Sequence, residues 1–152
     1  MEINGLPLHP LAVHAAVVLA PLVGVLALAS LVPSWRDRLR WPLVVGALVA
    51  IGAVVLAFVS GNSFRNANDF FSTPPSQVTR KIDHHHALAL TTVRVTVGFG
   101  AVALLSGLLH PKDGPLRWLL GALLAAGAIA VIVLVALTGD AGARAVWGGF
   151  NG

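Results

Sequence analysis

Histidine is the residue type in this sequence with the widest chemistry, and five of the six histidines fall into two short clusters. One cluster is His9 and His14, and the other is the run His84, His85 and His86. Neutral imidazole is the commonest metal ligand and titrates near neutral pH. Two imidazoles from facing helices can hold a b-type haem or part of a metal site. The clusters therefore predict a histidine-lined site, with proton transfer, pH sensing or an amphipathic role at a membrane surface as alternatives.

Several other kinds of chemistry lack the residues that they need. The chain has no cysteine, which excludes thiolate metal sites, Fe–S clusters and covalently attached haem. It contains no phosphate-binding loop, no G-x-S-x-G or H-E-x-x-H motif and no paired carboxylates, so nucleotide chemistry and hydrolysis have no support. Its ten Lys and Arg residues are scattered. We therefore expect neither a conventional enzyme nor a nucleic-acid-binding protein.

The composition indicates a protein embedded in lipid. Charged residues make up 11% of the 152 residues and hydrophobic residues 57%, whereas soluble domains carry about 25% charged residues. A helix needs roughly 20 apolar residues to cross a bilayer, and four stretches qualify, at residues 11–32, 42–60, 87–109 and 116–138. Gly61-Asn62 and Gly139-Asp140 are expected to end the second and fourth helices. The chain should thus form a single transmembrane domain over residues 1–152, an all-α four-helix bundle.

The basic residues predict how this bundle is oriented. The two short loops at residues 33–41 and 110–118 carry five of the ten Lys and Arg residues. The positive-inside rule places such loops on the cytoplasmic side of the membrane. Both termini and the two histidine clusters are then expected on the extracytoplasmic side.

A repeated tripeptide suggests that the bundle is one helical hairpin written twice. Leu39-Arg40-Trp41 recurs as Leu116-Arg117-Trp118, a shift of 77 residues. Two such hairpins would run parallel, related by an axis along the membrane normal. The shift aligns His9 with His86, but at 100° per residue the small and polar face of the third span aligns better with His85. The choice between these two neighbours stays open at this point.

Arg94 is a charged residue inside the third apolar span. It lies about 12 Å along the helix from His86, at 1.5 Å per residue. A charge at membrane depth costs roughly 2.5–3.5 kcal/mol on insertion scales and usually has a partner. We expect Asp140, at the outer end of the fourth span, or an anionic group such as a haem propionate to be that partner. The alternative is that Arg94 extends unaided to the membrane surface.

Three segments resemble one known family. They are the opening "INGLPLHPLAVHAAVVLAPL", the "HHHALAL" entry to the third span and the closing "LTGDAGARAVWGG". Together they are similar to the DUF2231 family of small bacterial four-helix membrane proteins. The resemblance implies that fold and a location in the bacterial inner membrane, and it matches His9, His14 and either His85 or His86 to the family's histidines. Asn62 stands where the family pattern leads us to expect an aspartate. Because the family's function is unknown, the resemblance implies topology rather than chemistry.

Three functions follow as hypotheses. In the first, the protein transfers electrons to or from a redox partner through a b-type haem near the outer face, with His9 and His86 as axial ligands, His14 and His85 as alternates, and Arg94 as the counter-charge. In the second, it is a structural or assembly subunit without its own cofactor, which docks into a larger, respiratory-type membrane complex through stripes of Gly and Ala. In the third, His9 and His86 hold copper or zinc.

Overall fold

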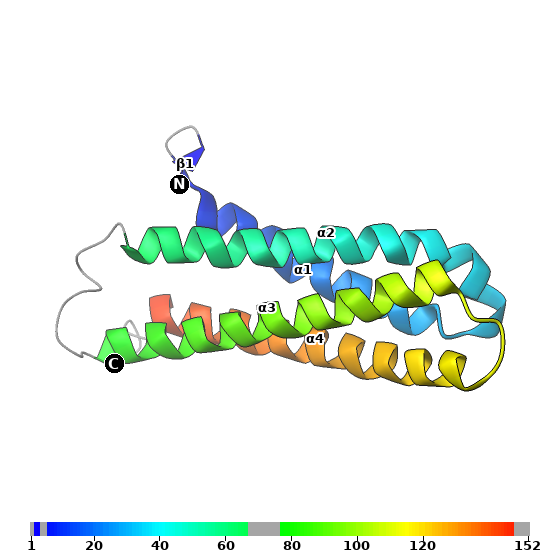
Figure 1. Ribbon diagram of the computed structural model, residues 1–152. Coiled ribbons are helices and arrows are strands. Elements are labelled where there is room, and N and C mark those ends of the chain that lie inside the picture. The colour runs from blue at the N-terminus through cyan, green and yellow to red at the C-terminus, as the bar shows by residue number, and fades with distance from the viewer. Residues whose placement is uncertain (1, 4–5, 67–76, 148–152) are drawn as a thin grey trace.

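The protein folds into four long helices that run up and down in one bundle (Figure 1). The computed structural model describes residues 2–3, 6–66 and 77–147. The helices are α1 (Leu8–Ala29), α2 (Pro33–Asn66), α3 (Gln77–Leu109) and α4 (Pro115–Trp147), and all four are long and apolar enough to cross a membrane. The predicted all-α membrane bundle is confirmed. A small antiparallel pairing of β1 (Glu2–Ile3) with β2 (Leu6–Pro7), which the sequence did not suggest, precedes α1.

Three of the helices continue well beyond the apolar spans. The helices α2, α3 and α4 contain 34, 33 and 33 residues, which corresponds to about 50 Å against a hydrocarbon thickness of about 30 Å. The expectation that Gly61 and Gly139 end their helices is wrong, because polar partners support the extra turns. Arg65 and Asp83 form an ion pair of 2.6 Å between α2 and α3.

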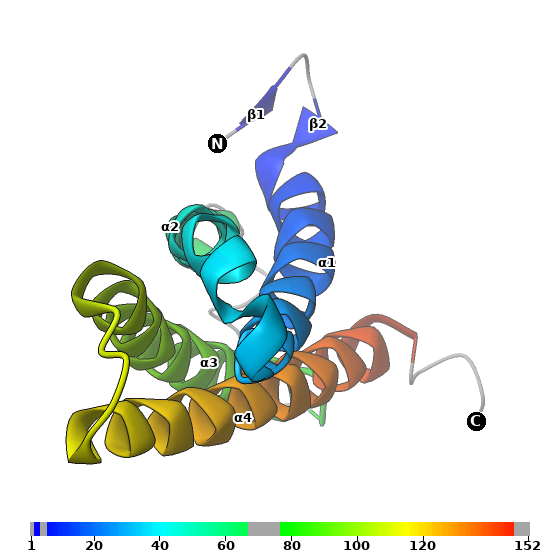
Figure 2. The same cartoon turned by 90° about the vertical axis from the view of Figure 1, so that its right-hand side faces the viewer.

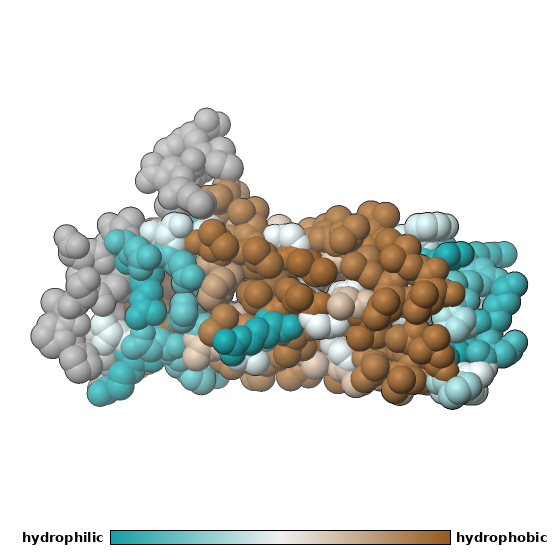
Figure 3. All heavy atoms as spheres, in the orientation of Figure 1, coloured by the Kyte–Doolittle hydropathy of each residue, from teal (hydrophilic) through white to brown (hydrophobic). Residues whose placement is uncertain are grey.

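The two ends of the bundle differ in chemistry, and we name them by their residues. The histidine end contains His9, the start of α3 and the last turns of α2 and α4. The arginine end contains the α1–α2 and α3–α4 connections, with Arg36 and Arg117. Figure 3 shows a hydrophobic surface along the middle of the bundle and hydrophilic atoms at both ends. The described N-terminal and C-terminal segments lie at the histidine end (Figure 1); which end faces the cytoplasm stays a prediction.

Each helix packs against two neighbours, in the cyclic order α1, α2, α3, α4 (Figure 2). Helix α1 thus lies diagonally across from α3, and α2 from α4. Many of the buried side chains are small, so the helix backbones approach closely, as is usual where lipid removes the hydrophobic driving force between helices. The fully buried alanines are Ala20, Ala27, Ala47, Ala103 and Ala128.

Contacts between helices repeat in pairs, as a duplicated hairpin requires. A Cβ added to Gly46 of α2 would lie 3.1 Å from Val23 of α1, and one added to Gly127 of α4 would lie 3.0 Å from Phe99 of α3. The contacts between hairpins obey the same rule, because Gly24 packs on Ile132 and Gly100 packs on Ile51. Exchanging α1 with α3 and α2 with α4 therefore reproduces the packing, which amounts to an approximate two-fold axis along the bundle.

The register of this duplication differs from the one expected. Equivalent buried positions lie 76 residues apart between α1 and α3, as for Gly24 and Gly100, and 81 apart between α2 and α4, as for Gly46 and Gly127. The shift of 77 taken from the Leu-Arg-Trp strings is thus wrong for all four helices. In α2 and α4 it errs by four residues, about one helical turn, which keeps the same face and makes the strings look aligned.

Candidate functional site: a pair of histidines at one end of the bundle

His9 and His85 make the same contact in the two hairpins. Nδ1 of His9 lies 3.0 Å from the carbonyl oxygen of Ala57 on α2, and Nδ1 of His85 lies 3.0 Å from that of Thr138 on α4. A carbonyl oxygen can only accept a hydrogen bond, so each Nδ1 carries the proton and donates it. In the neutral rings, Nε2 is consequently the nitrogen with a free lone pair.

A glycine makes room for each of these rings. Gly61 and Gly142 each follow the accepting carbonyl by four residues, so they lie on the same helix face. A Cβ at Gly61 would come within 2.9 Å of Cε1 of His9, and one at Gly142 within 3.0 Å of Cε1 of His85. The two histidines obey the 76-residue register and the two glycines the 81-residue register. The structural counterpart of His9 is therefore His85, and the alignment of His9 with His86 is corrected.

The Nε2 atoms of this pair are the unused groups of the site. Neither forms a hydrogen bond with any residue that the structure describes, and both side chains are only partly buried. The His9 ring stacks on Phe64, with ring centroids 6.5 Å apart. His9, His84 and His86 are close enough to His85 for charges on them to act on it. A histidine whose Nδ1–H is held by a carbonyl is oriented in the way that metal-ligating histidines usually are.

His86 faces a different helix from its neighbour. Its Nε2 lies 2.8 Å from Oδ1 of Asn62 on α2, and its ring packs 5.4 Å from that of Phe58. The amide oxygen accepts, so His86 donates from Nε2 and links α3 to α2. This contact gives Asn62, which departs from the expected aspartate, a defined partner.

His14 and His84 lie outside the pair. His14 is exposed on α1, and its Nδ1 bonds to the carbonyl oxygen of Pro10 in the same helix at 2.6 Å. His84 is exposed. Across residues 2–3, 6–66 and 77–147 there is no group of three or more His, Cys, Asp or Glu side chains that could hold a metal ion.

Arg94 lies on the exposed face of α3, and the expected partner is engaged elsewhere. Asp140 forms an ion pair with Arg144 at 2.8 Å, one turn along α4. Arg94 has no hydrogen bond or ion pair with the described part of the chain. The predicted pair between Arg94 and Asp140 is therefore not formed.

Thr92 and Thr138 form a polar link that sequence reasoning missed. Their hydroxyl oxygens lie 2.7 Å apart, joining α3 to α4 beside the bond from His85. The equivalent positions in the first hairpin are Ala16 and Ala57, so the polarity of this helix pair is specific to the second hairpin. The only available signal was the polar face of the third span, which does not reveal the partner helix.

A family comparison supports the architecture from sequence. The model of the DUF2231 family, described as a predicted membrane protein, matches residues 5–149. The chain belongs to the DUF2231 family. This membership confirms the resemblance noted above, covers all four helices and agrees with a multi-pass membrane protein. Neither the curated proteins nor the solved structures compared with the chain match it. The description of DUF2231 names no ligand, so the chemistry of this member has to be argued from its geometry.

Proposed function

We propose that this protein is a membrane electron-transfer protein in which His9 and His85 are the axial ligands of a b-type haem. The observation that carries the proposal is the symmetric pair of rings, each with Nδ1–H held by a carbonyl and Nε2 unpaired. Bis-histidine ligation requires two neutral, oriented imidazoles with exposed Nε2 lone pairs. The bound group would supply one-electron chemistry, and this chain would supply the ligands and their orientation.

The number of donors favours haem over a zinc or copper ion. Structural zinc sites take four protein ligands and catalytic ones three. The described residues bring together no such set, whereas a haem iron needs only two ligands from the protein because the macrocycle supplies the other four. His86 is the weaker ligand candidate because its Nε2 is already bonded to Asn62.

Charge at the same end supports an anionic group. A hollow of about 810 Å³ lies between the outer turns of α3 and α4, and basic side chains on its wall include Arg80, Lys81 and Arg144. Asp140, which pairs with Arg144, is the carboxylate among its lining residues. The excess of cations suits the carboxylates of a haem, which lie at the edge of the macrocycle.

Visible absorption of the purified protein tests this proposal. The full chain is expressed with a haem precursor, extracted in mild detergent and measured before and after reduction with dithionite. We expect sharp bands on reduction, and we expect them to be lost in His9→Asn and in His85→Asn. An asparagine amide can still donate to the carbonyl, so these variants remove the imidazole while retaining a donor. His14→Asn is the matched control and should keep the bands.

The outcomes separate the alternatives. A featureless spectrum, or bands that survive either substitution in the pair, would contradict bis-histidine haem ligation. Metal analysis of the same colourless protein would then decide whether copper or zinc is present. Bands lost equally in His14→Asn would point to a folding defect rather than to ligand loss, which circular dichroism of the three variants checks.

The exposed face of α3 favours a second function, that of a subunit within a larger membrane complex. Thr91, Arg94, Gly98 and Ala101 repeat at intervals of three and four residues, and all are exposed. Nothing lies within 4 Å of a Cβ added to Gly98, so another helix could approach closely there. A carboxylate on that helix would pair with Arg94 and remove the penalty of an unpaired charge in lipid.

The mass of the particle extracted from native membranes tests this docking function. We expect a complex well above the 15.7 kDa of one chain, and we expect Arg94→Gln to release the monomer. Arg38→Gln removes the same charge outside the apolar spans and should leave the complex intact. A wild-type protein that is monomeric in every mild detergent would contradict the docking function without affecting the haem proposal.

A further inference from the structure

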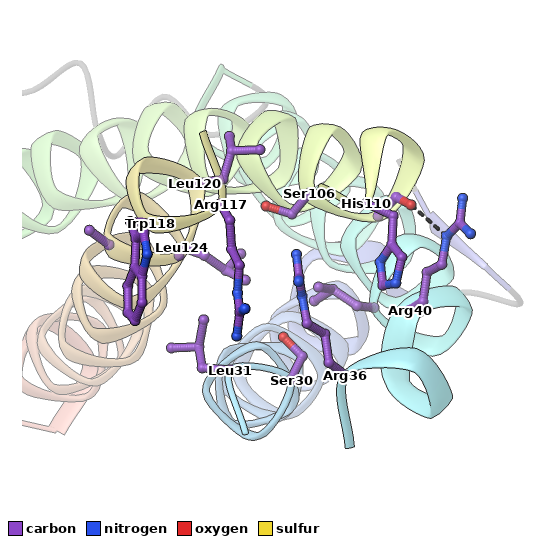
Figure 4. Close-up of a pocket in the computed structure, with 14 residues that line it drawn as sticks. Ser30, Leu31, Arg36, Arg40, Ser106, His110, Arg117, Trp118, Leu120 and Leu124 are labelled. Atoms are coloured by element: carbon purple, nitrogen blue, oxygen red, sulfur yellow. Dashed lines mark hydrogen bonds between the residues drawn. The ribbon is translucent and has the colours of Figure 1, made fainter. Parts of the chain in front are cut away.

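The arginine end of the bundle contains a cavity that the proposed function does not use. Its volume is about 290 Å³, and side chains from all four helix ends line it. Figure 4 shows Arg36 and Arg117 extending toward the space between Ser30 and Ser106. The walls are otherwise largely apolar, so charged groups that enter this space lose part of their hydration.

These four polar residues form two equivalent pairs. Ser30 and Ser106 obey the 76-residue register of α1 and α3, and Arg36 and Arg117 obey the 81-residue register of α2 and α4. The approximate two-fold axis of the bundle therefore relates one serine and one arginine to the other serine and the other arginine. Two cations arranged around an axis create a position of high positive potential on that axis.

The hydrogen bonds of the cavity leave donors unused. The Oγ of Ser30 donates to the carbonyl oxygen of Ala27 at 2.6 Å, whereas the Oγ of Ser106 is buried and has no partner in the described chain. Arg36 has no hydrogen bond or ion pair with the described residues. Arg117 donates to the carbonyl oxygen of Lys112 at 3.0 Å and has further N–H groups to offer.

Nearby carboxylates do not neutralise this charge. Asp37 binds His110 at 2.7 Å and is 87% exposed, and Asp113 lies 3.7 Å from Arg117 and is 94% exposed. Both acids face solvent at the rim. Arg40 also lines the cavity, but its Nε donates to the carbonyl oxygen of Gly107 at 2.6 Å and so closes the end of α3.

We propose that this cavity binds the phosphate of an anionic ligand between Arg36 and Arg117, with the hydroxyl of Ser106 as a further donor. Guanidinium groups bind phosphate oxygens through paired N–H donors, and a buried hydroxyl can complete the set. Basic pockets between membrane helices bind lipid head groups in this way. The same chemistry would accept free inorganic phosphate, and experiment distinguishes the two sources.

The position along the bundle fits a lipid head group. Trp41 and Trp118 are exposed at this end, and their rings lie 5.0 Å and 5.5 Å from the guanidinium carbons of Arg40 and Arg117. Exposed tryptophan marks the level of the membrane interface, where lipid phosphates lie. A head group could therefore enter the cavity while its acyl chains stay in the bilayer.

Native mass spectrometry and thermal unfolding of the full chain in detergent test the proposal. The protein is titrated with phosphatidylglycerol, phosphatidylcholine or inorganic phosphate, with chloride at equal ionic strength as the blank. The test variant is Arg36→Gln, which removes a charge that makes no internal bond. Arg38→Gln is the matched control, because it removes the same charge from the same turn but does not line the cavity. Ser106→Ala provides a second test variant.

The expected result is selective binding that depends on Arg36. We expect phosphatidylglycerol to be retained over phosphatidylcholine, and Arg36→Gln to lower this preference about fivefold, with a smaller loss in Ser106→Ala. Arg38→Gln should change it less than twofold. A thermal shift with inorganic phosphate alone, absent in Arg36→Gln, would support free phosphate as the ligand. Equal preference for both lipids with no shift in phosphate, or equal losses in Arg36→Gln and Arg38→Gln, would overturn the proposal.

Discussion

His85 on α3 donates its Nδ1 proton to the carbonyl oxygen of Thr138 on α4 at 3.0 Å, and Gly142 leaves the space in which the ring lies. His9 repeats this arrangement on Ala57 and Gly61 in the other hairpin. Each hairpin is thus closed at the histidine end by an imidazole that bonds a helix backbone. The same bond orients the ring for ligation, so packing and the proposed chemistry depend on the same contact.

Substitution of Gly142 by alanine should open this contact. A Cβ there would lie 3.0 Å from the His85 ring, and overpacking of this kind lowers the free energy of unfolding by about 1–3 kcal/mol. Gly139→Ala, three residues earlier on the same helix, meets nothing within 4 Å and is the control. The measurement is the unfolding midpoint in mixed micelles. Equal effects of the two substitutions would contradict the close packing of His85 on α4.

The hydroxyl link between Thr92 and Thr138 should be measurable as a coupling energy. A double-mutant cycle with Thr92→Val and Thr138→Val is expected to give about 0.6 kcal/mol, typical of hydrogen bonds between membrane helices. Thr91→Val is the control, because the hydroxyl of Thr91 is exposed and bonds only to the carbonyl oxygen of Ala87 in its own helix. A coupling of zero between Thr92 and Thr138 would show that the 2.7 Å contact does not hold the helices together.

Thr96 should respond in the opposite sense. Its side chain is 1% exposed, and its hydroxyl oxygen has no partner among the described residues. An unsatisfied buried hydroxyl is unfavourable, so the isosteric change Thr96→Val is expected to raise the free energy of unfolding by about 0.5–1 kcal/mol. The same unfolding measurement serves, with Thr92→Val as the comparison. A loss of stability in Thr96→Val would reveal a bond or bound group at this position.

The orientation of the bundle is testable because the chain has no cysteine. Ser34→Cys places a thiol at the arginine end and Asn66→Cys places one at the histidine end, and both positions are exposed. By the positive-inside rule, a membrane-impermeant maleimide applied to intact cells should label Asn66→Cys, and it should label Ser34→Cys only after lysis. The reverse pattern would place the histidine pair on the cytoplasmic side.

The fold was accessible from local sequence properties. Twenty consecutive apolar residues can satisfy their backbone hydrogen bonds in lipid only as a helix, so the spans follow from composition. Helix ends were less accessible. Beyond Gly61 and Gly139, hydropathy falls while helix continues, since ion pairs such as Arg65–Asp83 and Asp140–Arg144 stabilise the polar turns.

The candidate sites show a sharper division. The sequence alone determined that histidines gather at one end of a duplicated bundle, because clustering and repetition are properties of residue order. Whether His85 or His86 matches His9, and that Arg36 rather than Arg40 matches Arg117, was decided only by the tertiary structure. Neighbouring residues on a helix differ by 100° in direction, and residues one turn apart share a face. A repeat read from letters can therefore be displaced by a residue or a turn, and only the packing of one helix against another determines which side chains meet.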